Sequence, residues 1–158
     1  MKQITIYGKG GHGKVVEDTI NQLDPAMEVE YFDDTTNPYS ETYAKEADVI
    51  VAIGNNEVRK RIVSEVKHRF GTLIHPTAYV APTALIGEGT VVLANAVIQA
   101  DAKVGKHCII NANVTIDHDA VVEDYVCTYP SCYIAGFARV TELKTVKPGQ
   151  VVWKSEVF

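Results

Sequence analysis

The sequence predicts a small parallel α/β domain followed by a β-solenoid, and three observations support this prediction. A glycine-rich loop near the start of the chain joins a short β-rich segment to an amphipathic one. Alternating strand-like and helix-like segments then continue to about residue 71, as in parallel α/β units. From Ile74 to Val140 an aliphatic residue recurs at nearly every sixth position, a period that neither a helix nor a plain alternating strand produces.

Length and composition favour a globular protein and exclude several classes of partner. The 158 residues suffice for one domain or two small ones. A net charge of -5 and a pI near 5.5 leave no basic surface, so we expect no nucleic-acid partner. The sequence has no apolar run of about 18 residues and no signal-peptide pattern, so we expect a soluble, cytoplasmic protein without membrane insertion. Because no two cysteines have CxxC spacing, we expect reduced thiols and no metal site.

The first domain is expected to span residues 1–71. Its expected elements are strands over residues 3–7, 29–32 and 48–53, and helices from the glycine loop to Asp24 and over residues 57–70. At about 70 residues, such a unit is half the size of a full dinucleotide-binding fold, which argues against an NAD-dependent oxidoreductase.

The glycine loop predicts a phosphate-bearing ligand. Gly8, Gly10 and Gly13 match the pattern GxGxxG between a strand and a helix. Such glycines let the ligand approach the backbone, and the helix N-terminus favours phosphate. Asp33 and Asp34, about 20 residues on, could accept hydrogen bonds from a ribose or base. The alternatives are a loop that only makes the turn and aspartates that only cap one.

The solenoid is expected to span residues 72–141 in about four stacked coils, with two inward-facing ladders. Eleven of the twelve members of the first ladder are Ile or Val. They are Ile74, Val80, Ile86, Val92, Ile98, Val104, Ile110, Ile116, Val122, Thr128, Ile134 and Val140. The second ladder lies four residues after each of these positions and holds small or β-branched residues, including Cys108 and Cys132. The alternative is an ordinary sandwich with coincidental spacing.

After Val140 the hexad pattern is expected to end. Residues 142–158 are predicted to form a C-terminal cap or tail that folds over the last coil, because the end of a solenoid must be covered. Its apolar residues would be Val146, Val151, Val152, Trp153 and Phe158.

His118 is the candidate catalytic residue of the solenoid. It lies between Asp117 and Asp119, whose carboxylates would raise its basicity and hold one tautomer. The alternative is an exposed histidine on a corner of the solenoid.

Several motifs in order give the chain a family resemblance. They are the glycine loop in the form G-x-x-G-H-G, Phe32-Asp33-Asp34, the segment 51–59 (VAIGNNEVR), Leu73-Ile74-His75-Pro76 and Ile116-Asp117-His118-Asp119. The sequence resembles the bacterial nucleotide-amino-sugar acetyltransferases of the sialic-acid O-acetyltransferase type. Within them it is most similar to the UDP-4-amino-sugar N-acetyltransferases of the bacillosamine pathway. The resemblance implies a nucleotide-sugar-binding domain, a left-handed parallel β-helix and a homotrimer.

The resemblance also implies residue roles. His118 matches the family's catalytic base, and Asp119 matches the carboxylate that strengthens it. The expected nucleotide-sugar contacts are Gly10, Gly11, His12, Asp33, Asp34 and Gly54. Cys127 stands where relatives commonly have a histidine that contacts acetyl-CoA. Relatives also continue through further hexads, so the sequence predicts weak binding of acetyl-CoA.

The expected function is acetyl-CoA-dependent transfer of an acetyl group to the amine of a nucleotide-linked sugar, with UDP as the expected nucleotide, in surface-glycan biosynthesis. His118 would take the proton that the amine loses. The alternatives are O-acetylation of a sugar hydroxyl and a non-catalytic nucleotide-sugar-binding relative that has lost donor binding.

Overall fold

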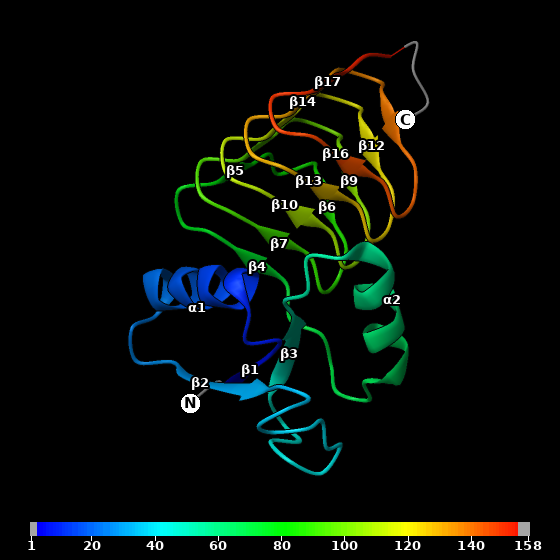
Figure 1. Cartoon of the computed structure of the whole chain (residues 1–158). Coiled ribbons are helices and arrows are strands. Elements are labelled where there is room, and N and C mark those ends of the chain that lie inside the picture. The colour runs from blue at the N-terminus through cyan, green and yellow to red at the C-terminus, as the bar shows by residue number, and fades with distance from the viewer. Residues whose placement is uncertain (1–2, 155–158) are drawn as a thin grey trace.

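The computed structural model describes residues 3–154, which form an α/β domain with a β-solenoid stacked on it (Figure 1). In the first domain, three parallel strands lie in the order β2-β1-β3. Its elements are β1 (Gln3–Tyr7), α1 (Gly11–Leu23), β2 (Glu28–Phe32), β3 (Asp48–Val51) and α2 (Asn56–Glu65). The domain therefore has the predicted order of elements, with a second helix shorter than expected.

One helix covers each face of this sheet. Val16 and Ile20 of α1 pack on Ile6 of β1, and the same cluster includes Leu73 and Val91 of the solenoid. On the opposite face, Ile62 of α2 and Val66, which follows the helix, pack on Tyr7, Phe32 and Val51, among others. Helix α1 thus lies between the sheet and the solenoid, while α2 stands at the side (Figure 1).

The solenoid is a coil of two-residue strands arranged in three parallel sheets. Sheet C holds β4 (Leu73–Ile74), β7 (Val91–Val92), β10 (Ile109–Ile110), β13 (Cys127–Thr128) and β16 (Thr145–Val146). Sheet D holds β5 (Tyr79–Val80), β8 (Val97–Ile98), β11 (Thr115–Ile116), β14 (Tyr133–Ile134) and β17 (Val151–Val152). Sheet E holds β6 (Leu85–Ile86), β9 (Lys103–Val104), β12 (Val121–Val122) and β15 (Arg139–Val140). Each residue pairs with the residue 18 positions on, such as Leu73 with Val91, so one turn consists of three hexads.

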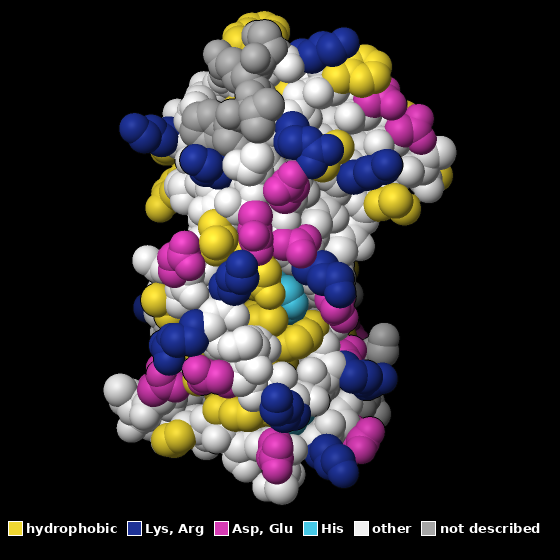
Figure 2. Space-filling model, turned by 90° about the vertical axis from the view of Figure 1, so that its right-hand side faces the viewer, with side chains coloured by type: hydrophobic (Ala, Val, Ile, Leu, Met, Phe, Trp, Pro, Cys, Tyr) yellow, Lys and Arg dark blue, Asp and Glu magenta, His cyan; other side chains and the backbone are white. Residues whose placement is uncertain are grey.

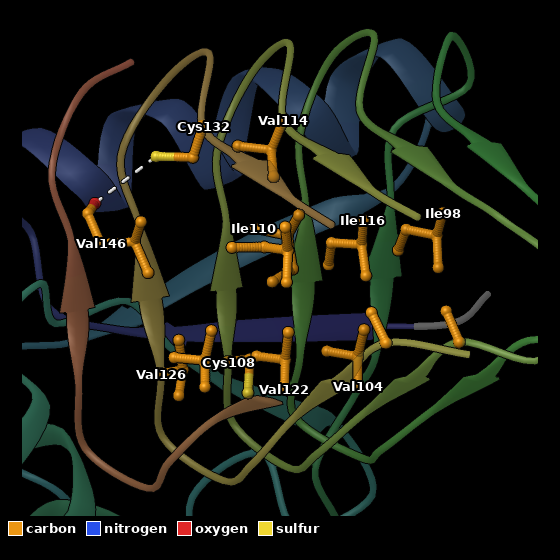
Figure 3. Packing of buried hydrophobic residues seen from close by; sticks show 14 of the residues in the cluster. Ile98, Val104, Cys108, Ile110, Val114, Ile116, Val122, Val126, Cys132 and Val146 are labelled. Carbon is orange, nitrogen blue, oxygen red and sulfur yellow. Dashed lines mark hydrogen bonds between the residues drawn. The ribbon is translucent and has the colours of Figure 1, made fainter. Parts of the chain in front are cut away.

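The inward ladder is confirmed. From Val92 to Val140 every member of the first ladder is at most 4% exposed, and these side chains point into one continuous core (Figure 3). Ile74, Val80 and Ile86 in the first turn are only partly buried. Thr128, the one polar member, donates a hydrogen bond from its hydroxyl to the carbonyl of Ile109, which makes its burial possible.

The corners of the solenoid have a second regularity that sequence analysis did not anticipate. One residue in every six has a positive φ, from Gly89 to Gly149, with non-glycine residues at all the positions between. They are Asn95, Asp101, His107, Asn113, Asp119, Tyr125, Ser131, Phe137 and Leu143, with φ between 53° and 64°. Each of these residues therefore turns the chain by adopting the left-handed backbone conformation, which has an energetic cost for L-residues.

The prediction of a cap over residues 142–158 is wrong for the described part of the segment. Thr145 pairs with Cys127 and Val151 pairs with Tyr133, so the segment continues the coil. Val146 and Val152 extend the six-residue ladder and are fully buried, which is why their backbone takes up the same geometry. The boundary expected at 141/142 therefore falls inside the solenoid, and Phe158 lies outside the described residues.

The two domains are joined by buried polar side chains as well as by apolar packing. Arg59 of α2 is 1% exposed and donates hydrogen bonds to the carbonyls of His107 and Tyr125 on the solenoid. It also donates to the carbonyl of Ile53 in its own domain. Asn56 donates from its side-chain nitrogen to the carbonyl of Leu143. These bonds hold the start of α2, and the loop before it, against the solenoid.

The face that carries α2 shows positive and negative side chains interspersed, with no patch of a single sign (Figure 2). Among residues 3–154, no helix is long and apolar enough to cross a membrane.

Candidate active site

The glycines of the β1–α1 loop divide into two kinds. A Cβ at Gly13 would lie 2.1 Å from the carbonyl oxygen of Gly8, and one at Gly8 would lie 2.6 Å from Ile53, so these two glycines allow the loop to pack. A Cβ at Gly10 or Gly11 would meet nothing within 4 Å. Because packing does not explain Gly10 and Gly11, the space beside them remains open for a ligand at the N-terminus of α1.

His12 stands beside that opening. Its Nε2 atom is buried and has no hydrogen-bond partner. Burial, and secondarily the charge of Arg59, lowers the pKa of His12 to about 4, so its imidazole is neutral near pH 7. A buried polar atom without a partner is costly, and a bound polar ligand would remove this cost.

Asp33 and Asp34 at the end of β2 are already engaged. The Asp33 carboxylate accepts hydrogen bonds from the backbone and hydroxyl of Thr35, which lowers its pKa. Asp34 accepts a 2.7 Å hydrogen bond from the hydroxyl of Tyr7. The turn-capping alternative therefore describes Asp33, while Asp34 remains an exposed carboxylate at the same sheet edge as the glycine loop.

Gly54 lies at the junction of the two domains. It lines a pocket of about 450 Å³ together with residues of the loop before α2 and of the solenoid. The other lining residues are Asn55, Asn56, Glu57, Tyr129, Leu143 and Thr145. Sequence analysis did not single out Tyr129 or Thr145, because only the fold brings them to Gly54. A larger hollow of about 580 Å³ over sheet E contains none of the predicted site residues.

His118 and Asp119 form a hydrogen-bonded pair on the corner between β11 and β12. The imidazole Nδ1 donates to the Asp119 carboxylate at 2.9 Å, and Asp119 adopts φ 58°. This bond raises the pKa of His118 above its ordinary value. Desolvation lowers that pKa, but the charges of Asp117 and Asp119 raise it further. With Nδ1 occupied as donor, Nε2 carries the lone pair and can act as a base.

The next turn of the solenoid shapes the space around this base. A Cβ at Gly136 would lie 2.9 Å from Nε2 of His118. Any residue other than glycine at position 136 would therefore displace the imidazole. The ring of Phe137 packs edge-on against the imidazole, with 5.2 Å between the ring centres. The His118 side chain is nevertheless 53% exposed, so an incoming substrate can reach it.

Cys127 does not join the His118 group in this chain. It lies on β13 in sheet C, is 5% exposed, and burial raises the pKa of its thiol. Its neighbour Tyr129 is 45% exposed and lines the pocket at Gly54. Within residues 3–154, no three His, Cys, Asp or Glu side chains gather in a group that could hold a metal ion.

The predicted site residues thus lie in two places on one chain. The first domain packs on sheet C and on the corner that leads into it, through contacts at Leu73, Val91, His107 and Tyr125. His118 occupies the corner between sheets D and E, on the opposite side of the three-sided coil. The structure therefore brings His118 together with Asp119, and Gly10 and Gly11 with His12, but it does not bring the two groups together.

Comparison with known families and proteins agrees with this architecture. Residues 3–66 match the PglD N-terminal domain, and residues 83–118 match the bacterial transferase hexapeptide (six repeats). The chain is 39% identical over 112 residues to the UDP-N-acetylbacillosamine N-acetyltransferase of Bacillus subtilis (strain 168). That match covers 59% of this chain and 52% of the relative, so the chain spans about half the length of the curated relative it matches.

Solved structures extend the likeness over nearly the whole chain. The acetyltransferase domain of PglB from Neisseria gonorrhoeae FA1090, in complex with acetyl coenzyme A, is 31% identical with a TM-score of 0.87. The match covers 95% of this chain and 81% of that one. A mutant of perosamine N-acetyltransferase from Caulobacter crescentus, in complex with CoA and GDP-perosamine, is 27% identical with a TM-score of 0.82. There the coverage is 96% of this chain and 82% of that one.

The hexapeptide solenoid, with an outward-facing imidazole on one corner, places the chain among the bacterial hexapeptide-repeat transferases. The first domain narrows this class. Its match to the PglD N-terminal domain and its 31% identity to the PglB acetyltransferase domain place the chain in the PglD family.

Proposed function

We propose that this protein transfers the acetyl group of acetyl-CoA to the amine of a nucleotide-linked amino sugar, with His118 as the general base. The observation that carries the proposal is the His118–Asp119 pair, which leaves the lone pair of Nε2 free beside Gly136 on a half-exposed side chain. The similar PglB domain in complex with acetyl coenzyme A supports acetyl-CoA as the donor. The intact pair also argues against a purely binding role.

In the proposed reaction, the neutral amine attacks the thioester carbonyl carbon and a C–N bond forms. The proton that the amine loses passes to Nε2 of His118, while Asp119 stabilises the resulting imidazolium through Nδ1. The C–S bond then breaks, and His118 returns the proton to the departing thiolate. Atoms and charges balance without a metal or a covalent enzyme intermediate.

For the nucleotide sugar, we propose binding at the open side of the glycine loop. Gly10 and Gly11 offer space and α1 offers N–H groups to a diphosphate. Further proposed contacts are His12, whose buried Nε2 has no partner, and the exposed carboxylate of Asp34. Gly54, which lines the pocket at the domain junction, is the last proposed contact. We propose UDP as the nucleotide, because the relative with 39% identity is named for a UDP sugar. The Caulobacter structure holds GDP-perosamine, so the base must be tested directly.

We further propose that the working assembly is a homotrimer in which the two groups of site residues come from neighbouring chains. Within one chain, His118 lies across the coil from the sheet on which the first domain packs. A second copy that places its His118 corner beside the pocket at Gly54 would complete the site. The same arrangement would bring an acetyl donor toward Tyr129 and the neighbouring Cys127, which remains the predicted donor contact.

The His118→Ala substitution tests the chemistry. Turnover of acetyl-CoA with a UDP-amino sugar should fall on the order of a hundredfold, with the Kd of both substrates unchanged. The measurement is thiol release together with mass spectrometry of the product. Stability of the product to mild base would identify an amide, whereas loss of the acetyl group would identify O-acetylation. Full turnover by the variant would show that His118 is only a corner residue.

The Gly11→Val substitution tests the nucleotide-sugar site. A Cβ at Gly11 meets nothing within 4 Å, so we expect the fold to be unchanged while the ligand space is filled. Calorimetry should show at least about tenfold weaker binding of a UDP-amino sugar, with acetyl-CoA affinity unchanged. Equal affinity of variant and parent would refute the site. If the parent binds a GDP-sugar more tightly than a UDP-sugar, GDP replaces UDP as the proposed nucleotide. If the parent binds the sugar but does not turn it over, the protein is a non-catalytic relative.

A further inference from the structure

His118 is held by a second carboxylate that the reaction does not use. Asp117 accepts a hydrogen bond from the backbone N–H of His118, with 2.7 Å between that nitrogen and Oδ1. Its other oxygen, Oδ2, accepts a 2.6 Å hydrogen bond from the hydroxyl of Tyr133, one turn further along the solenoid. The hydroxyl of Tyr133 is therefore linked to the backbone of the catalytic corner through a single side chain.

Tyr133 is itself fixed in place. Its backbone lies in β14 and pairs with Thr115 just before the corner, while its half-buried ring packs edge-on against Trp153 at 6.3 Å between ring centres. The bond from Tyr133 is the largest cause that lowers the pKa of Asp117, so the carboxylate stays ionised and remains a strong acceptor. The result is a rigid link between two turns.

The tyrosine link at His118 is not repeated in the earlier turns of sheet D. One turn earlier, the positions of Asp117 and His118 are occupied by Gln99 and Ala100. Tyr79 lies in the same sheet and the same outward column as Tyr133, but it makes no side-chain hydrogen bond within residues 3–154. A comparable link stands one hexad further on, where Glu123 accepts hydrogen bonds from the Arg139 side chain and from the backbone N–H of Glu142. Carboxylate links between turns therefore recur in the solenoid, and the one at Asp117 holds the backbone of His118.

We propose that Tyr133 is a positioning residue for His118, acting through Asp117. The link holds the His118 backbone so that the imidazole can bond Asp119 through Nδ1 while Nε2 faces the space beside Gly136. A base must be held to within a fraction of an ångström of its working geometry, and small displacements are costly in rate. The inference rests on the proposed function in that His118 is taken as the base.

The test compares Tyr133→Phe with Tyr79→Phe, its matched control. Tyr133→Phe keeps the ring on Trp153 and removes only the hydroxyl. We expect kcat to fall about tenfold with KM for both substrates within about twofold of the parent, since orientation and not binding is lost. Tyr79→Phe should match the parent. An unchanged kcat in Tyr133→Phe, or a loss that appears in KM alone, would overturn the inference.

A double-mutant cycle tests whether Tyr133 acts through Asp117. Asp117→Asn should lower kcat and move the acid limb of the pH profile to lower pH, because it removes one of the two carboxylates that raise the pKa of His118. Tyr133→Phe, which keeps both charges, should leave that limb in place. The kcat of the double variant should be no lower than that of Asp117→Asn alone. If the kcat losses of the two single variants multiply in the double variant, Tyr133 acts independently of Asp117.

A measurement without substrate separates this inference from the proposed function. The amide proton of His118 should shift upfield and exchange faster in Tyr133→Phe, as seen by nitrogen-15 NMR, and stay unchanged in Tyr79→Phe. If the chemical shift and the exchange rate of the His118 amide proton are unchanged in Tyr133→Phe, the link is refuted even if the enzyme is active. If the parent fails to turn over any nucleotide-linked amino sugar, the proposed function fails, and the amide signal still decides the link.

Discussion

The inside and the outside of the solenoid follow different rules. Inside, from Val92 onward, almost every position is a buried aliphatic or small residue, and each turn repeats the one before it. Outside, no two turns are alike. The corner at His118 carries the hydrogen-bonded pair with Asp119, the corner at Tyr125 receives Arg59, and the first domain packs on sheet C.

This difference separates stability from function within the same 18-residue turn. Each turn of the repeated apolar interior adds to the free energy of folding, and so does each interface between neighbouring turns. The outer surface does not have to pack, so single residues there can serve binding and catalysis. Substitutions inside should therefore change stability, and substitutions at the outer corners should change assembly of the domains or chemistry.

The largest effect is expected from Ile98→Asp, inside the coil. Ile98 is fully buried, and an ionised carboxylate there would have no partner. We expect the free energy of unfolding to fall by about 4 kcal/mol or more, measured by urea denaturation. The control is Val97→Asp in the same strand, whose side chain points outward and should be far better tolerated. Equal melting of Ile98→Asp and the parent would contradict the inward assignment.

A smaller loss of stability is expected from Arg59→Met at the domain junction. Methionine keeps apolar volume but leaves buried carbonyls, including those of His107 and Tyr125, without their donor. The expected loss is about 3 kcal/mol, concentrated in the first domain. Hydrogen exchange should show that domain opening while the solenoid stays protected. Arg61→Met on the exposed side of α2 is the control, because Arg61 forms an exposed ion pair with Glu65 and does not reach the solenoid carbonyls that Arg59 binds. Uniform opening of both domains in Arg59→Met would refute the junction role.

The smallest effect is expected from Asp119→Asn, beside the proposed base His118. Loss of the carboxylate should lower kcat about tenfold and leave stability unchanged, because both residues of the pair are largely exposed. The base works only when unprotonated, so activity is lost as pH falls through the pKa of His118. That pKa is raised in the parent, so the acid limb of kcat/KM should move to lower pH in the variant.

Asp101→Asn is the matched control for Asp119→Asn. Asp101 occupies the same corner one turn earlier, with φ 60°, and has no histidine before it. Asparagine tolerates the left-handed region, so neither variant introduces strain. An equal pH shift in both variants would show that the effect is not specific to His118.

Much of the architecture could be predicted because it is encoded locally. The six-residue ladder predicted the interior from residue 92 to residue 140, and the glycine pattern between a strand and a helix predicted the loop at α1. The His118–Asp119 pair was predictable for the same reason, since adjacent residues must lie close together.

The errors came where local cues weakened. The sequence from Thr145 to Val152 predicts a cap because turn-forming residues around Pro148 obscure a ladder that Val146 and Val152 continue. The corner residues with positive φ escape sequence analysis because their side chains are diverse, from Asn95 to Phe137. Their conformation is imposed by the coil and not by residue preference.

By itself, the sequence determined which side chains form the interior and that His118 and Asp119 lie side by side, because burial periodicity and adjacency are properties of the chain. Only the tertiary structure decided which distant residues meet. It joined Arg59 to the carbonyls of His107 and Tyr125, Gly54 to Tyr129, and Tyr133 to Asp117. It also separated His118 from the glycine loop by the width of the coil. These contacts depend on the number of residues in one turn and on the face of the solenoid that the first domain covers. Both are properties of the folded coil and not of any short segment of the sequence.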